Sequence, residues 1–139
     1  MPASQGTQSM VIASELEAFF AGQDSLPEVV SCGKSADAFD ICLDVQAGLI
    51  WFPGHFPGTP VLPGIVQLHW AAIAASCLYG LDGAPRTVSR LKFKKVVVPP
   101  LQLLLRLEAG KPGEIRFTFT SGQFQHSLGT LVFSVADPC

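Results

Sequence analysis

Two histidines stand close together in a stretch that is otherwise apolar and rich in proline and glycine. The stretch, at residues 51–72, reads WFPGHFPGTPVLPGIVQLHWAA; it contains His55 and His69 but no carboxylate, lysine or arginine. An imidazole changes its charge near neutral pH and can therefore take up or release a proton in a reaction. These residues indicate a site for proton transfer, provided that the surrounding elements position the two rings.

The segment around His55 is expected to be stiff. Its prolines fix φ and remove backbone donors, and its glycines permit a close approach of the backbone. The prolines and glycines concerned are Pro53, Gly54, Pro57, Gly58, Pro60, Pro63 and Gly64. A stiff loop can hold a catalytic side chain in one geometry. The residues leave open the alternative that His55 is buried and hydrogen-bonded to backbone in a structural connection.

Gly64 stands where a helix is expected to begin. The run GIVQLHWAAIAASCLYG at residues 64–80 follows Pro63, which suits a helix start, and finishes at Gly80, which suits a helix end. Free N–H groups at a helix N-terminus attract a negatively charged oxygen. His55 beside this helix end could therefore remove a proton next to a carbonyl, while the helix end stabilises the charge on the enolate oxygen.

The helix over 64–80 is apolar on all sides, so we expect it to be buried. Strands are predicted over residues 28–33, 37–46, 88–98, 101–109, 114–120 and 124–136, and a short helix over 11–21. Apolar and polar residues alternate in the second strand, as in a half-buried antiparallel strand. The sequence therefore predicts an α+β fold, in which a curved antiparallel sheet wraps around one long buried helix.

Composition limits the class of protein. The 139 residues suffice for one domain, which we expect over residues 10–139, with residues 1–9 disordered. With 48% hydrophobic and 14% charged residues, part of the surface is expected to pack against a second subunit. A formal charge of −2 offers no general attraction to nucleic acid. We expect no signal peptide, no membrane span and a cytoplasmic location.

The motif GHFPGTPVLPG followed by IVQLHWA resembles the active-site segment of the β-hydroxyacyl-[acyl carrier protein] dehydratases of the FabA/FabZ type. The residues of this motif resemble in particular those of the ApeI-like dehydratases of aryl polyene gene clusters. RLKFKKVVVPP and SLGTLVF resemble later strands of the same family, so the resemblance extends over residues 28–136. It implies a hot-dog fold and removal of water from a 3-hydroxyacyl thioester to give a trans-2-enoyl thioester, in fatty-acid-like or polyene biosynthesis.

The resemblance also implies roles and partners. His55 matches the catalytic histidine, and Gly64 matches the residue whose N–H binds the thioester carbonyl. No cofactor and no metal are implied. The expected partner is an acyl carrier protein with a phosphopantetheine-linked acyl chain. Two protomers would pair, as a homodimer or higher oligomer or as a heterodimer with another hot-dog subunit, and each site would combine the histidine of one chain with the helix residue of the other.

His69 stands where the family has aspartate or glutamate, fourteen residues after His55. An imidazolium at His69 could protonate the departing hydroxyl while a neutral His55 acts as the base. Alternatively, His69 binds substrate in an altered enzyme such as a thioesterase. In a third reading, the chain is a structural partner of an active dehydratase.

Basic residues gather in the span 86–95. Arg90, Lys92 and Lys94 alternate with apolar residues, so they are expected on one face of a strand, followed by Lys95. These four residues form either a solvated outer face or a docking surface for the acidic carrier protein. His126, near a turn, is expected at the surface.

Overall fold

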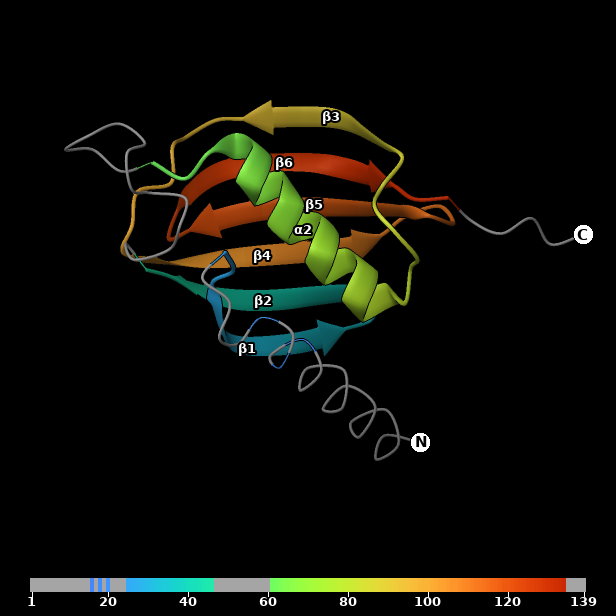
Figure 1. The fold of residues 1–139 in the computed structure, drawn as a ribbon, viewed down its shortest axis with the longest axis horizontal. Coiled ribbons are helices and arrows are strands. Elements are labelled where there is room, and N and C mark those ends of the chain that lie inside the picture. Colours follow the sequence, from blue (N-terminus) through green and yellow to red (C-terminus); the bar gives the residue numbers. More distant parts are fainter. Residues whose placement is uncertain (1–15, 17, 19, 21–24, 47–60, 135–139) are drawn as a thin grey trace, which may run out of the picture.

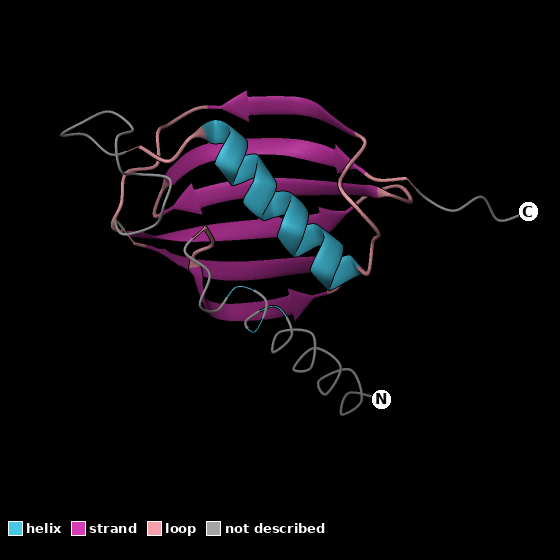
Figure 2. Cartoon of the chain, in the orientation of Figure 1, coloured by secondary structure: helices cyan, strands magenta, loops and turns pink. Residues whose placement is uncertain are grey.

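The computed structural model describes residues 25–46 and 61–134, together with Leu16, Ala18 and Phe20. Seven elements lie in residues 25–46 and 61–134 (Figure 2): β1 (Glu28–Ser35), β2 (Ala38–Val45), α2 (Gly64–Tyr79), β3 (Thr87–Phe93), β4 (Leu101–Ala109), β5 (Glu114–Ser121) and β6 (Phe124–Val132). Leu16, Ala18 and Phe20 are helical, as predicted for those three positions. Among the described helices, none is long and apolar enough to cross a bilayer.

The six strands form one antiparallel sheet in the order β1-β2-β4-β5-β6-β3, and α2 lies across one face of it (Figure 1). In β2 the apolar side chains Phe39, Ile41 and Leu43 are buried toward α2, while Asp40 and Asp44 are partly exposed. The period of two, which turns successive side chains to opposite faces, therefore produces the half-buried strand that the sequence predicts. The α+β architecture is confirmed.

Helix α2 is buried on one side only in the single chain. Seven residues facing the sheet are buried: Val66, Gln67, Trp70, Ala71, Ala74, Ala75 and Leu78. The opposite side exposes Ile65, with 71% of its surface accessible, and His69. The expectation of burial all round is therefore not met within one chain, because the sheet forms a single layer that covers one side of the helix.

Tyr79 ties the end of α2 to the sheet. Its hydroxyl lies 2.6 Å from the carbonyl oxygen of Asp37 and 3.3 Å from that of Leu107. Its ring packs edge-on against Phe39 with 5.2 Å between the ring centroids. Burial raises the pKa of Tyr79 to about 12, and the negative charges of Asp37 and Glu108 act in the same direction.

This shift gives a testable titration, because Tyr79 is the only tyrosine of the chain. An acid whose pKa is raised by folding stabilises the fold below its unfolded pKa of about 10, and the contribution is lost as the pH rises further. We expect phenolate absorbance of the folded protein to have its midpoint near pH 12, against about 10 in denaturant. Equal midpoints in the two states would contradict the buried hydroxyl.

Strand β3 is interrupted and shorter than predicted. Its pairing with β6 shifts between Ser89 and Lys92, and Arg90 has a φ of 54°. Two residues of β3 thus oppose one residue of β6, which is a β-bulge. Beyond Phe93 the chain leaves the sheet edge, and Val97 forms an isolated bridge with Leu62. The bulge breaks the simple alternation expected for this strand.

His126 lies in β6 and is 3% exposed, so the prediction of a surface histidine is wrong. Its Nδ1 lies 3.2 Å from the carbonyl oxygens of both Lys95 and Val96. Because carbonyls only accept, Nδ1 carries a proton, while Nε2 lies 2.6 Å from the Ser121 hydroxyl, within hydrogen-bond distance. His126 is buried because it supplies the donor that these carbonyls need.

Candidate active site

The N-terminus of α2 presents backbone donors that the helix itself does not use. Pro63 precedes the helix in an extended conformation, with no side-chain cap and no acidic residue in the first turn. The N–H groups of Val66 and Gln67 donate to the Pro63 carbonyl at 3.1 and 3.2 Å. The N–H groups of Gly64 and Ile65 have no carbonyl ahead of them in the helix. A helix end of this kind attracts a negatively charged oxygen, so the geometry is compatible with the oxyanion role expected for Gly64, which stays a prediction.

Phe93 at the end of β3 packs directly over Gly64. A Cβ added to Gly64 would lie 2.7 Å from two atoms of the Phe93 ring. A side chain at position 64 would therefore push the ring aside and cover the helix end. Glycine at position 64 thus permits the close approach of this ring.

Gly64 opens into a hollow of about 560 Å³. Its wall joins the start of α2 to the end of β3, and its lining residues are Val61, Leu62, Pro63, Gly64, Ile65, Gln67, Phe93, Lys94, Lys95 and Val96. Two of the four predicted docking cations, Lys94 and Lys95, thus lie at the same hollow as the predicted oxyanion donor. Lys95 also places its ammonium 4.5 Å from the centroid of the Phe124 ring.

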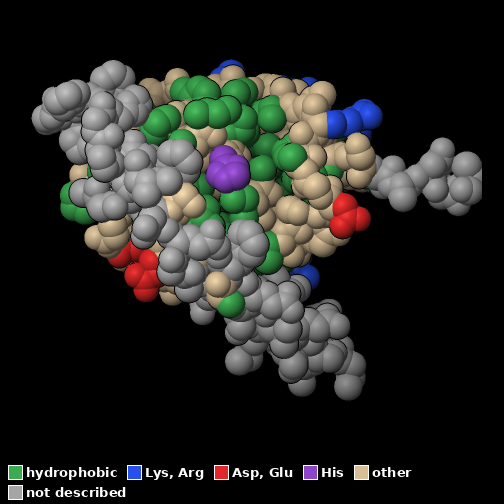
Figure 3. Space-filling view, viewed as in Figure 1, with side chains coloured by type: hydrophobic (Ala, Val, Ile, Leu, Met, Phe, Trp, Pro, Cys, Tyr) green, Lys and Arg blue, Asp and Glu red, His purple; other side chains and the backbone are tan. Residues whose placement is uncertain are grey.

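His69 lines a different hollow, of about 450 Å³, on the outer side of α2. Ala72, Ile73 and Cys77 of the helix and Ala84 of the following loop contribute apolar walls. In the space-filling view, a histidine on this face is surrounded by hydrophobic side chains (Figure 3). Five residues along a helix of 3.6 residues per turn separate Gly64 and His69 by about 140° around the axis. The two predicted site residues therefore do not face each other within one chain.

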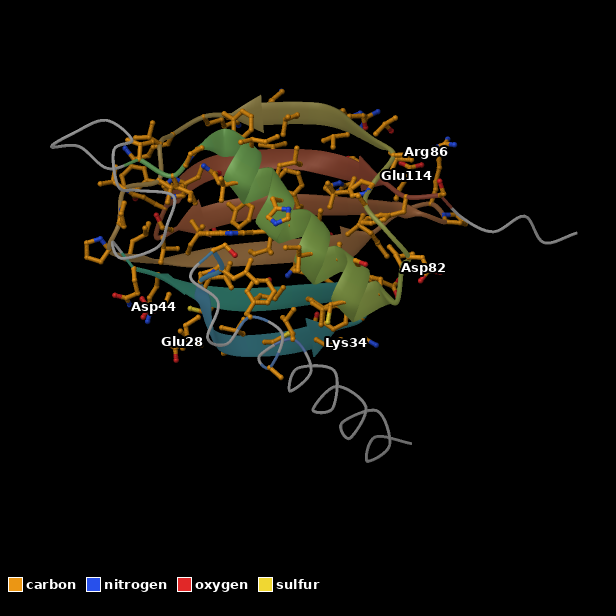
Figure 4. All side chains as sticks on the ribbon, viewed as in Figure 1. Glu28, Lys34, Asp44, Asp82, Arg86 and Glu114 are labelled. Carbon is orange, nitrogen blue, oxygen red and sulfur yellow. The ribbon has the colours of Figure 1, made fainter. Side chains whose placement is uncertain are left out.

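Figure 4 labels six charged side chains, which lie around the ends and outer strands of the sheet: Glu28, Lys34, Asp44, Asp82, Arg86 and Glu114. None of these six is drawn over the middle of α2.

The remaining predicted site residues are placed less centrally or lie outside the described residues. His55 belongs to residues 47–60, which lie outside the described part of the chain. Lys92 is exposed on β3. Arg90, at the bulge, lines a third hollow of about 300 Å³ with Lys111, Glu114 and Arg116. The four cations predicted to act together are therefore divided, with only Lys94 and Lys95 at the Gly64 hollow.

Sequence reasoning missed three residues that shape this site: Phe93, Gln67 and Ser127. In the sequence, Phe93 is simply one of the apolar residues that alternate with Arg90, Lys92 and Lys94. Gln67 and Ser127 form a buried pair, with Ser127 Oγ 2.8 Å from Gln67 Oε1. The available signal was a glutamine inside an otherwise apolar helical run. It could not be interpreted, because a helix with apolar residues on every side does not reveal which side faces the sheet.

Comparisons with known proteins agree with this architecture. Among solved structures, the fold matches "The Dehydratase Heterocomplex ApeI:P from Xenorhabdus doucetiae" with a TM-score of 0.70 and 28% identity, over 76% of this chain and 96% of that one. The dehydratase domain of a mycocerosic acid synthase-like polyketide synthase matches in fold, with a TM-score of 0.64 at 20% identity, over 84% of this chain and 42% of that one. The chain therefore has the hot-dog fold of dehydratase domains.

Proteins related by sequence are also dehydratases. The 3-hydroxyacyl-[acyl-carrier-protein] dehydratase FabZ of Syntrophomonas wolfei is 37% identical over 65 residues, 42% of this chain and 45% of that protein. FabZ of Legionella pneumophila is 36% identical over 76 residues, 48% of this chain and 49% of that protein. The matches thus span about half the length of these relatives. The family model described as ApeI dehydratase matches residues 31–130. The chain belongs to the ApeI-like dehydratase family.

Proposed function

We propose that this protein removes water from a 3-hydroxyacyl thioester carried by an acyl carrier protein and gives the trans-2-enoyl thioester. The observation that carries the proposal is the open helix end at Gly64, at a hollow of about 560 Å³, in a chain of the ApeI-like dehydratase family. An N–H donor at this place stabilises the negative charge that develops on the thioester oxygen when the α-proton leaves.

The proposed reaction assigns one role to each predicted site residue. His55 takes the proton from the α-carbon, and the Gly64 N–H holds the thioester oxygen of the resulting enolate. The electron pair then forms the carbon–carbon double bond as the bond to the 3-hydroxyl breaks. His69 of a second chain gives its proton to the leaving hydroxide, so that water departs.

A second hot-dog chain is the proposed partner. In the part of the chain that the structure describes, β3 is an edge strand, and exposed apolar side chains stand near it and near the start of α2. They include Ile65 at 71%, Phe93 at 52% and Val96 at 59% exposure. Exposed apolar side chains gathered at one edge of the sheet favour association with a second chain. Pairing there also explains how a site could combine Gly64 of one chain with His69 of the other, although they face apart within a chain.

A second candidate function is that of a structural subunit. Two observations favour it: His69 replaces the family acid, and the matched Xenorhabdus protein is named as part of a dehydratase heterocomplex. In that case the chain alone converts no substrate and forms an active enzyme only with a second hot-dog subunit. The test is an assay of the purified chain on a 3-hydroxyacyl carrier protein, with and without subunits that co-purify with it.

Carrier-protein docking by Lys94 and Lys95 gives a separate prediction, because these cations line the Gly64 hollow. Reversing both charges, in Lys94→Glu with Lys95→Glu, is expected to raise KM for a carrier-bound substrate about tenfold with little change in kcat. The effect should shrink in high salt. A short thioester without carrier protein should show no such increase.

The matched control is Lys34→Glu, at the distant end of β1 (Figure 4). It changes the net charge in the same direction without altering the Gly64 hollow and should leave KM unchanged. Arg90→Glu, tested alone, shows whether the docking surface extends along β3 to the bulge. An equal rise of KM in Lys34→Glu and in the double variant would argue against a local docking surface.

A further inference from the structure

A polar bridge is buried in the apolar layer between α2 and the sheet. Of the seven α2 residues buried against the sheet, only Gln67 is polar. Gln67 is 3% exposed, and Ser127 of β6, which it contacts, is 0% exposed. Burying an amide and a hydroxyl costs free energy unless both are hydrogen-bonded. An apolar pair would fill this space without that requirement, so the bridge is expected to serve a purpose beyond packing.

The hydrogen bonds of this bridge have one consistent direction. Gln67 Nε2 lies 3.3 Å from the carbonyl oxygen of Leu62, and because a carbonyl only accepts, the amide nitrogen must face it. The amide oxygen then faces Ser127, whose hydroxyl donates to it at 2.8 Å. Among the described residues, no buried side-chain nitrogen or oxygen lacks a partner. Both ends of the Gln67 amide are therefore in use.

The side-chain bridge holds Leu62, two residues before Gly64. The Gln67 side chain binds the carbonyl of Leu62, and the Gln67 backbone N–H donates to the carbonyl of Pro63 at 3.2 Å. The N–H of Leu62 donates to the carbonyl of Val97 at 2.9 Å. Leu62 is thus fixed through both of its peptide groups, one bound to the helix and the other to the segment after β3. These bonds restrict the backbone conformation of the residues that lead into α2.

We propose that Gln67 is a positioning residue which, together with Ser127, aims the Gly64 N–H at the oxygen of the substrate. The Gln67 side chain acts through Leu62, since it lies on the buried side of α2 and binds the Leu62 carbonyl. The inference rests on the proposed function of Gly64 as the oxyanion donor. It extends that function to a residue outside the predicted site.

Loss of the bridge is expected to slow the chemical step rather than substrate binding. A displacement of about 1 Å in a catalytic group can cost on the order of 100-fold in rate. The contact with the thioester oxygen strengthens as charge develops in the transition state, so its loss lowers kcat and leaves KM nearly unchanged. For Gln67→Met, which keeps the volume and removes the donor, we expect kcat to fall about 10- to 100-fold with KM within about twofold.

Gln67→Glu gives a pH-dependent kcat that would not be expected if Gln67 only filled space in the core. A protonated carboxyl can accept from Ser127 and donate to the Leu62 carbonyl, whereas an ionised carboxylate has no proton to donate. Burial raises the pKa of the introduced carboxyl, because it disfavours the charged form. The ratio of kcat in Gln67→Glu to kcat in the wild type should therefore be highest at low pH and fall as the pH rises. Taking the ratio removes any pH dependence that the two proteins share.

Tyr79→Phe is the matched control, since it removes a hydroxyl bonded to two carbonyls at the other end of α2. It should keep kcat within about twofold of the wild type, as expected for a change remote from the chemistry. Ser127→Ala should act in the same direction as Gln67→Met, because it leaves the amide oxygen without its donor. Wild-type kcat in Gln67→Met, or a pH-independent ratio for Gln67→Glu, would overturn the proposal.

Hydrogen exchange separates this inference from the proposed function. If the wild type dehydrates no substrate, the proposed function fails, but the exchange rate of the Leu62 amide, which donates to the Val97 carbonyl, still tests the bridge. This rate should rise in Gln67→Met and stay at the wild-type value in Tyr79→Phe. Equal exchange in the wild type, Gln67→Met and Tyr79→Phe would contradict the role of Gln67. An active wild type with an equally active Gln67→Met would also contradict that role, but it would leave the proposed dehydratase function intact.

Discussion

The His55→Ala variant is expected to lose about 10²- to 10⁴-fold in the rate of dehydration, the range typical of removing a general base. The reason is chemical: the α-proton of a thioester is only weakly acidic, and the polarisation of its oxygen at Gly64 does not by itself provide an acceptor for that proton. The loss should appear in kcat, since the acyl chain and the carrier protein make other contacts. Formation of the enoyl thioester measures it directly.

The control for this variant is His55→Gln, which keeps a polar side chain of similar reach but accepts no proton at neutral pH. It should be as inactive as His55→Ala, and both should keep the melting temperature of the wild type within a few degrees. If His55→Gln or His55→Ala retained the wild-type rate, His55 would not be the base. The enolate mechanism would then need another acceptor.

Replacing His69 should also have a large effect, because the proposed mechanism needs a proton for the leaving hydroxide. For His69→Leu, which suits the apolar hollow around it, we expect kcat to fall about 10²-fold or more. The rate at which the enoyl thioester forms measures this loss. His69→Asp restores the family's residue type and should remain active, with a pH profile different from that of the wild type. An inert wild type beside an active His69→Asp would show that His69 is no proton donor.

Mixing inactive chains tests whether the site is shared. A dimer of one His55→Ala chain and one His69→Leu chain contains one doubly altered site and one intact site, if each site draws its two histidines from different chains. Co-expression in equal amounts, with random pairing, should therefore restore about a quarter of the wild-type activity. If both histidines act within one chain, every site stays altered and no activity returns.

The strands were the most predictable part of this fold. Strand β4 coincides with the predicted run 101–109, and β2 is buried at the alternate positions that its pattern indicated. In both strands, local alternation and burial on one face agree. Strand β3 departs from its prediction because the bulge at Arg90 and the later bridge from Val97 to Leu62 depend on partners distant in sequence.

The candidate site was predictable in its types of residue but not in its arrangement. Gly64 lies at the helix start because Pro63 and the apolar run determine that boundary locally. The exposure of His69 was not predictable, since a helix that is apolar all round gives no indication of which side the sheet covers. The burial of His126 depends on the Lys95 and Val96 carbonyls, which reach it only in the folded chain. Gln67 and Ser127 pair for the same reason.

The central claim is that this chain is itself a dehydratase, and product analysis of the purified wild type on a 3-hydroxyacyl carrier protein tests it most directly. The expected result is a trans-2-enoyl thioester that stays attached to the carrier, formed by the chain alone and without release of free thiol. Free thiol without enoyl product would identify a thioesterase. No conversion by the chain alone, with conversion once a second hot-dog subunit is added, would identify a structural partner and contradict the proposed mechanism.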